Sequence, residues 1–105
     1  MLIIEVYRVR VDRANVARLL EIRGAAMAEF REQVPELRQA DLVRLDDDVW
    51  LDIRTWMKAA DPETVDRAAQ RLPTYVEMQS LMTARLGHDR GERVHTTGTA
   101  WAAGR

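Results

Sequence analysis

Runs of alternating and helically spaced apolar residues divide the chain into successive regular elements. Residues 2–11 are rich in β-branched and aromatic residues and predict a strand with apolar side chains on both faces. Apolar residues then recur at helical spacing up to about Gln33. Asp12 or Asn15 could cap this helix, and Pro35 just beyond it prevents its continuation.

The second half of the chain predicts a β-hairpin, two consecutive helices and a short last strand. The hairpin joins strands at 37–45 and 49–56 through a turn of three aspartates. An aspartate followed by a proline and a glutamate begins a helix over 61–72, and a second proline begins another over 73–86, with a glycine directly beyond it. Residues 92–97 predict the final strand.

The β-α-β-β-α-β order predicts an α+β protein of the ferredoxin-like, split βαβ class, with an antiparallel sheet covered by helices on one face. Residues 1–97 would form a single domain. Residues 98–105 would form a flexible C-terminal tail, which contains Trp101. The uncovered sheet face would carry apolar side chains into water. We therefore expect a homodimer in which two sheets pack face to face.

Composition narrows the choice of partners. The chain has 105 residues, a net charge of −1 and no cysteine. The absence of a basic excess argues against nucleic acid as a partner. No apolar run approaches the roughly 20 residues needed to cross a bilayer, so we expect no membrane partner. The N-terminus does not resemble a signal peptide, and without cysteine there are no disulfides or thiolate sites. The simplest expected location is cytoplasmic.

Three segments together resemble a known family. They are Arg8-Val9-Arg10-Val11 at the end of the first strand, the strand start after Pro35, and Arg54-Thr55-Trp56 at the end of the third strand. This combination resembles the dimeric α/β-barrel superfamily and, within it, the antibiotic-biosynthesis monooxygenase family. The resemblance implies a dimeric α/β barrel with a pocket between the sheet and the helices of each subunit.

The resemblance also implies a chemistry. Better-understood members oxygenate an aromatic, polyketide-like or quinol substrate without metal, flavin or haem, so we expect no cofactor. Those monooxygenases place an asparagine in the pocket near the tryptophan, whereas the only asparagine here is Asn15. The haem-degrading branch uses a helix histidine, and residues 62–86 contain none.

Trp56, Arg23 and Tyr75 are the candidate catalytic residues. Trp56 occupies the family position and would be a stacking wall for an aromatic ligand, or a core aromatic. Arg23 lies between apolar residues at helical spacing, so it could face inward and stabilise a developing enolate or phenolate, or lie at the edge with its head in water. Tyr75 could donate a hydrogen bond to a substrate oxygen.

Five further residues are candidates for substrate binding beside Trp56: Glu5, Tyr7, Met27, Met78 and Met82. Glu5 interrupts an apolar strand face and could be a general base, or it could form a structural ion pair with Arg8, Arg54 or Arg23. Tyr7 is equally explained by packing. The methionines suit an adaptable pocket or an ordinary core.

The remaining polar residues predict little chemistry. Asp52 and Arg54 share a strand face with two tryptophans and would be a pair at a rim or a dimer interface. His88 and His95 lack metal-ligand spacing, so no metal site is expected, although His95 could act as a base. The leading hypothesis is a cofactor-independent monooxygenase-like protein. The alternatives are a non-catalytic ligand-binding or assembly protein and a lactone or ketone isomerase.

Overall fold

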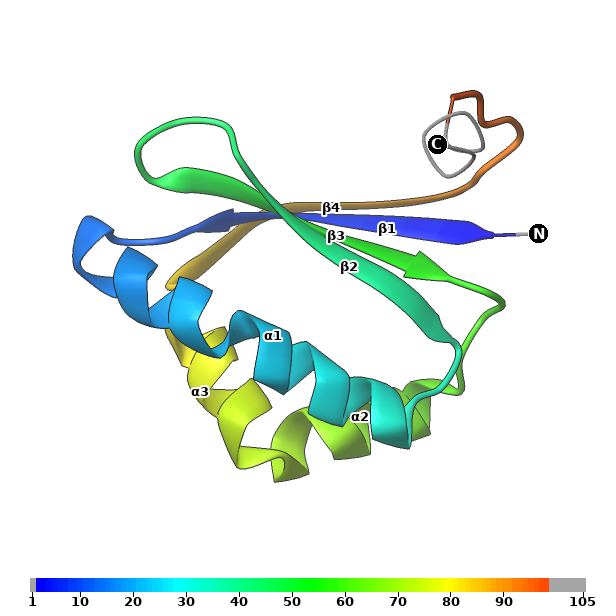
Figure 1. The fold of residues 1–105 in the computed structure, drawn as a ribbon, viewed down its shortest axis with the longest axis horizontal. Coiled ribbons are helices and arrows are strands. Elements are labelled where there is room, and N and C mark those ends of the chain that lie inside the picture. Colours follow the sequence, from blue (N-terminus) through cyan, green and yellow to red (C-terminus); the bar gives the residue numbers. More distant parts are fainter. Residues whose placement is uncertain (1, 99–105) are drawn as a thin grey trace.

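A computed structural model describes residues 2–98, which form a four-stranded antiparallel sheet with three helices on one of its faces (Figure 1). The elements, in chain order, are β1 (Ile3–Arg10), the 3-10 turn η1 (Arg13–Asn15), α1 (Val16–Gln33), β2 (Leu37–Arg44), β3 (Val49–Trp56), α2 (Pro62–Arg71), α3 (Pro73–Ser80) and β4 (Ala84–Glu92). The predicted ferredoxin-like, α+β order is confirmed, with the second helical unit divided at Pro73. The predicted tail, apart from its first residue, lies outside the described residues, and so does Trp101.

The strands lie in the order β2-β3-β1-β4, so β1 and β3 form the centre of the sheet. In the register, Glu5 of β1 faces Arg54 of β3 and Arg90 of β4. Tyr7 faces Asp52 on one side and His88 on the other. Side chains alternate between the two faces of a strand, so these residues all project from the face that the helices cover.

Local signals position the helices only in part. Asp61 caps α2 as its sequence suggests: its carboxylate accepts a hydrogen bond from the Thr64 amide at 3.2 Å. Asn15 occupies the N-cap position of α1, as one of the two alternatives predicted, but its side chain makes no capping hydrogen bond, and Asp12 precedes η1 instead. The Asn15 amide instead donates to the Leu81 carbonyl at 3.4 Å. Within residues 2–98, no helix combines the length and hydropathy that a bilayer crossing requires.

The last helix and the last strand differ from the prediction. α3 ends at Ser80 rather than at Leu86, and β4 occupies 84–92 rather than 92–97. Gly87, expected just beyond the helix, pairs with Arg8 within the sheet. Every residue of β4 is exposed, so backbone pairing with β1 determines this edge strand and no apolar pattern marks it in the sequence.

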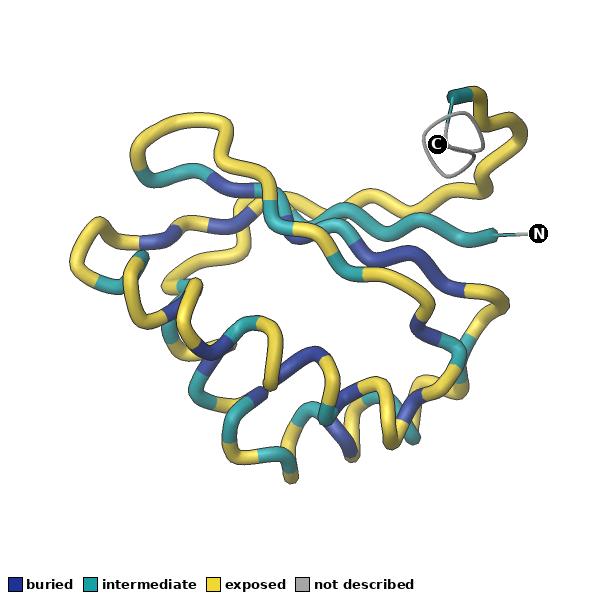
Figure 2. Tube along the Cα trace, in the orientation of Figure 1, coloured by how far each residue is buried: buried dark blue, intermediate teal, exposed yellow. Residues whose placement is uncertain are grey.

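The core fills the space between the covered sheet face and the helices (Figure 2). Phe30 of α1 is fully buried at its centre. Its ring stacks on Tyr75 of α3, with 4.6 Å between ring centroids, and meets the edge of Trp56 of β3 at 6.4 Å. These aromatic contacts connect α1, α3 and β3.

No helix of residues 2–98 covers the opposite sheet face (Figure 1). Its central apolar side chains come from β1 and β3, and each is only half-buried: Ile4, Val6, Leu51 and Ile53. The predicted apolar face without a helical cover is therefore present in this chain.

Truncating the central aromatic residue should expose the dependence of the fold on this core. We expect Phe30→Ala to lower the free energy of unfolding by about 3–5 kcal/mol, because it removes a fully buried ring and leaves a cavity. Urea denaturation followed by circular dichroism measures the change. Leu20→Ala is the control on the exposed side of α1, where the expected change is within about 0.5 kcal/mol. Equal effects of the two variants would contradict this view of the core.

Candidate functional site

Two adjoining hollows lie between the covered sheet face and α2. Their volumes are about 170 Å³ and 220 Å³, and both are bounded by Tyr7, Arg54, Val65 and Asp66. We call them the tryptophan hollow, which Trp56 lines, and the tyrosine hollow, which Tyr75 lines. Ligand pockets commonly have volumes of roughly 300–1,000 Å³. A ligand with several fused rings would therefore have to occupy both hollows.

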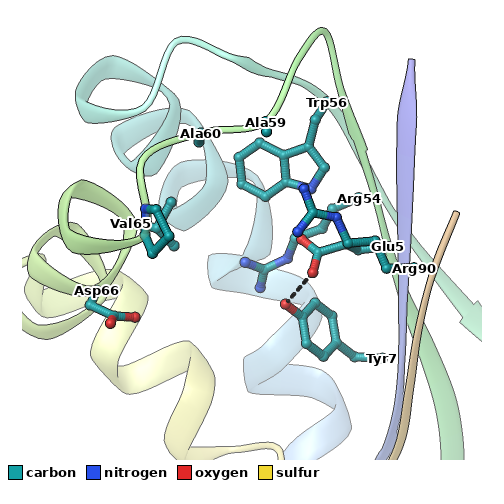
Figure 3. A pocket seen from close by; sticks show the side chains of 10 residues that line it. Glu5, Tyr7, Arg54, Trp56, Ala59, Ala60, Val65, Asp66 and Arg90 are labelled. Carbon is teal, nitrogen blue, oxygen red and sulfur yellow. Dashed lines mark hydrogen bonds between the residues drawn. The ribbon is translucent and has the colours of Figure 1, made fainter. Parts of the chain in front are cut away.

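The tryptophan hollow combines an aromatic wall with charged side chains. Figure 3 shows the Trp56 indole, the Arg90 guanidinium and the Glu5 carboxylate converging from the sheet, with Val65 and Asp66 of α2 on the other side. The Trp56 side chain is almost fully buried, and its indole nitrogen has no hydrogen-bond partner within residues 2–98. The indole nitrogen of Trp50, outside both hollows, is unpaired in the same way, so this feature does not distinguish the site.

Asp52 holds two arginines beneath the helices. Its Oδ1 accepts a hydrogen bond from Arg23 of α1 at 2.8 Å, and its Oδ2 accepts one from Arg54 at 3.0 Å. The side chains are all buried: the exposed fraction is 11% for Arg23, 3% for Asp52 and 7% for Arg54. Two cations and one anion leave one positive charge in excess, so the site favours a negatively charged ligand group.

The protonation states of this cluster follow from its geometry. Burial alone would raise the pKa of Asp52, but Arg54 and then Arg23 outweigh burial and hold that pKa below its ordinary value. Burial alone would lower the pKa of Arg54, but Asp52 and Tyr75 reverse this effect and raise it. Asp52 is therefore ionised and Arg54 protonated at neutral pH.

Arg54 is also the centre of an aromatic enclosure. Its guanidinium carbon lies 5.4 Å from the Tyr7 ring centroid, 5.4 Å from that of Tyr75 and 5.7 Å from that of Phe30. Arg54 donates to the Tyr75 hydroxyl at 2.5 Å. Because that hydroxyl accepts from Arg54 and makes no other hydrogen bond within residues 2–98, its own proton is free to be donated into the tyrosine hollow.

A second polar group is centred on Glu5, which lines the tryptophan hollow together with Tyr7. The Glu5 carboxylate accepts a hydrogen bond from the Tyr7 hydroxyl at 3.1 Å, and the His88 ring nitrogen lies 2.9 Å from the same oxygen. The His88 and Tyr7 rings stack in parallel with 4.4 Å between centroids. Burial, together with Glu5, raises the pKa of Tyr7 to about 12. Tyr7 is therefore a neutral hydrogen-bond donor across the physiological range.

The structure brings most of the predicted site residues together. Those that line the two hollows are Glu5, Tyr7, Trp56, Tyr75 and Met82. Arg23 faces inward as one alternative suggested, but it contacts Asp52 and the Met78 sulfur and lines neither hollow. Met78 is fully buried in the core, and Met27 borders a separate depression between α1 and β2.

Two expectations about polar residues require correction. Asp52 and Arg54 do form a pair, but it does not lie at a rim or interface, because both residues are buried under the helices. Alternation with Trp50 and Trp56 on one strand face was the signal for this placement. Glu5 makes no ion pair with Arg8, Arg54 or Arg23; its partners within residues 2–98 are Tyr7 and His88.

Several residues of the site were not predicted from the sequence. Ala59, Ala60, Val65, Asp66 and Arg90 line the tryptophan hollow, and His88 supports Glu5 beside it. Arg90 and His88 belong to β4, whose position the sequence did not predict. Within residues 2–98, no group of three or more histidine, cysteine, aspartate or glutamate side chains is arranged to hold a metal ion.

The same fold occurs in several solved structures. A mutant of SnoaB, a cofactor-independent oxygenase from Streptomyces nogalater, matches with a TM-score of 0.62 and 23% identity, over 91% of this chain and 96% of SnoaB. A proposed antibiotic biosynthesis monooxygenase from Chloroflexus aurantiacus matches with a TM-score of 0.58 and 17% identity, over 93% of this chain and 98% of its own. Rv0793 from Mycobacterium tuberculosis matches with a TM-score of 0.57 and 13% identity, over 93% and 100% of the two chains.

Neither a protein-family model nor a curated protein matches this sequence. The structural likeness extends along nearly the whole chain, so this protein has the fold of the antibiotic biosynthesis monooxygenase-like proteins, as its sequence predicts. Identities below one quarter establish the fold, and the chemistry has to be argued from the site.

Removing the Asp52 carboxylate should destabilise the protein. We expect Asp52→Asn to lower the free energy of unfolding by about 3–5 kcal/mol, because two buried cations lose their counter-charge. The exposed pair of Asp47 with Arg13 provides the control: Asp47→Asn should change stability by less than about 1 kcal/mol. Urea denaturation at pH 7 compares the three proteins.

The same carboxylate should make the fold sensitive to acid. Because the folded pKa of Asp52 lies below its ordinary value of 3.8, the unfolded chain binds a proton first as the pH falls. The stability contributed by Asp52 is thus present above about pH 4 and is lost below it. Unfolding curves from pH 6 downward should show a shallower loss for Asp52→Asn than for the wild type. Parallel curves would contradict this assignment.

Proposed function

We propose that this protein is a cofactor-independent monooxygenase-like enzyme that acts on an aromatic, polyketide-like or quinol small molecule. The observation that carries the proposal is the buried Arg54 cation, which lines both hollows close to the Trp56 wall. An electron-rich aromatic substrate requires a stacking surface and a positive charge when it ionises. The fold shared with SnoaB, itself a cofactor-independent oxygenase, supports the same conclusion.

The proposed reaction uses the substrate as its own source of electrons. For an anthrone, deprotonation of the ring methylene yields an enolate that transfers electrons to molecular oxygen. One oxygen atom becomes the new carbonyl oxygen, the other leaves as water with the two methylene hydrogens, and the four electrons come from the substrate carbon. The protein has to favour the enolate and hold it in an apolar enclosure.

Each proposed residue has a distinct role in that enclosure. Trp56 would stack against the substrate rings, and Arg54 would stabilise the negative charge of the enolate. Tyr75 would donate its free hydroxyl hydrogen to the same oxygen. Arg23, the candidate from the sequence, would act at a distance by fixing Asp52 and through it Arg54. Met82 would complete the apolar lining of the tyrosine hollow.

We also propose that the protein is a homodimer that packs through its uncovered sheet face and that it works in the cytoplasm. Half-buried aliphatic side chains of the two central strands form this face, and contiguous apolar surface favours association. The cytoplasmic location is favoured by a sequence without cysteine.

One observation favours a second candidate function. The Glu5 carboxylate in the tryptophan hollow could transfer a proton within a substrate. A lactone or ketone isomerase needs such a transfer, and its reaction consumes no oxygen. An isomerase would convert its substrate under nitrogen. A protein that only binds ligands would leave them unchanged and gain thermal stability.

Oxygen uptake with EDTA present is the first test of the proposed activity. The wild-type protein should consume oxygen above background with members of a panel of anthrones and quinols. We expect Trp56→Phe to lower kcat/KM by up to about tenfold, because it loses part of the stacking surface, a contact worth roughly 0.5–1.5 kcal/mol. No uptake with any member of the panel would overturn the proposal.

Trp50→Phe is the matched control for that experiment. Trp50 is an equally buried tryptophan of β3, but it lines neither hollow. This variant should retain wild-type kcat/KM, and circular dichroism should show that both variants are folded. Equal losses in the two variants would mean that Trp56 acts through packing alone.

The oligomeric state can be tested separately. Sedimentation at micromolar concentration should give the mass of a dimer for the wild type. Ile53→Lys should shift it toward the monomer, because a charge placed within the apolar contact is costly to desolvate. Leu20→Lys changes an exposed leucine on the helical side and should leave the dimer intact. A monomeric wild type would exclude this assembly.

A further inference from the structure

We propose that Glu5 is the general base that removes the proton from the substrate, held for this task by Tyr7 and His88. The inference rests on the proposed function, because it supplies the deprotonation with which oxygenation begins. It also stands apart from oxygen chemistry, since proton removal can be followed without oxygen.

The two oxygens of Glu5 have different surroundings. Oε2 accepts the Tyr7 hydroxyl at 3.1 Å and lies 2.9 Å from Nε2 of His88. Oε1 makes no hydrogen bond within residues 2–98, while Glu5 lines the tryptophan hollow (Figure 3). One oxygen thus holds the carboxylate in place, and the other is available to a ligand.

The supporting residues are themselves fixed. Tyr7 and His88 face each other across β1 and β4, and their rings stack at an interplanar angle of 3°. Arg85 of β4 lies over the Tyr7 ring at 4.7 Å. Rotation of the Glu5 carboxylate would break its contacts with both Tyr7 and His88. These two residues therefore hold the orientation that a general base requires.

Charged side chains of both signs surround Glu5 in the hollow. In the sheet register, Glu5 of β1 is paired with Arg54 of β3 on one side and with Arg90 of β4 on the other. Asp66 of α2 is the other acidic residue lining the hollow. Proton transfer from the substrate to Glu5 replaces one anion by another within the hollow, so the total charge of the site is unchanged by the step.

The step itself balances simply. A C–H bond of the substrate breaks, an O–H bond forms at Oε1 of Glu5, and the electron pair remains on the substrate as an enolate. Tyr7 cannot take this proton, because it is a neutral phenol with its pKa raised to about 12. The His88 ring nitrogen contacts the Glu5 carboxylate, and the His88 side chain is the more exposed of the two, at 39% against 14%. Because His88 contacts Glu5 from the solvent side, we assign it a positioning role.

Deuterium exchange of an anthrone under nitrogen tests this inference. With anthrone in buffered D₂O, proton NMR follows the loss of the ring methylene signal. The wild-type protein should accelerate the exchange, and Glu5→Gln should slow the catalysed rate by about 100-fold, the lower end of what general bases contribute. Quenching of tryptophan fluorescence by anthrone should give the same dissociation constant for both proteins.

Positioning is tested by variants of the supporting residues. His88→Leu and Tyr7→Phe should each slow the exchange by about tenfold, with KM unchanged. His88→Gln should restore most of the rate, because its amide nitrogen can still donate to Oε2. The control is His95→Leu, which changes the other histidine, whose partner is Thr97, and should leave the rate as it is.

The outcomes separate this inference from the proposed function. Exchange that depends on Glu5, combined with no oxygen uptake, would uphold the base and overturn the oxygenase. Oxygen uptake with exchange that persists in Glu5→Gln would overturn the base and leave the oxygenase standing. No catalysed exchange by the wild type would overturn the base, and failure of His88→Gln to rescue would remove His88 from its role.

Discussion

The ion cluster at Asp52 is the interaction on which the rest of the site depends. Its carboxylate binds Arg23 of α1 and Arg54 of β3, and Arg54 in turn reaches Tyr75 of α3. One anion therefore connects two helices to the central strand of the sheet. A buried polar network of this kind is costly unless each member is satisfied. The cluster therefore restricts the helices to one position and leaves Arg54 facing the cavity.

Most of the fold could be predicted because its elements carry strong local signals. The alternating pattern of the hairpin, the spacing of α1 and the Asp61-Pro62 start of α2 all correspond to observed elements. The exception is the stretch after Ser80, where apolar residues continue at helical spacing although the chain has left the helix. β4 is a fully exposed edge strand, so its place is determined by pairing with β1, which a sequence pattern does not report.

The site was predictable where a side chain is large and aromatic. Trp56, which the family resemblance singled out, lines one hollow, and the candidates Tyr7 and Tyr75 line the hollows as well. Arg54 was missed because a charged residue on a strand is usually an exposed one. Only its partner Asp52, two residues earlier on the same face, makes its burial possible, and that compensation depends on three-dimensional contacts rather than on local pattern.

The composition of the sheet edge has a consequence for how this cavity can diversify. The central strands contribute Arg54 and Trp56, which are buried, and α2 closes the other side of the tryptophan hollow. The edge strand β4 contributes Arg90, and every residue of this strand is exposed. Substitutions at exposed positions usually cost little stability. Arg90 and its neighbours can therefore change during evolution without disturbing the packing, so the scaffold can acquire new ligand preferences through one strand.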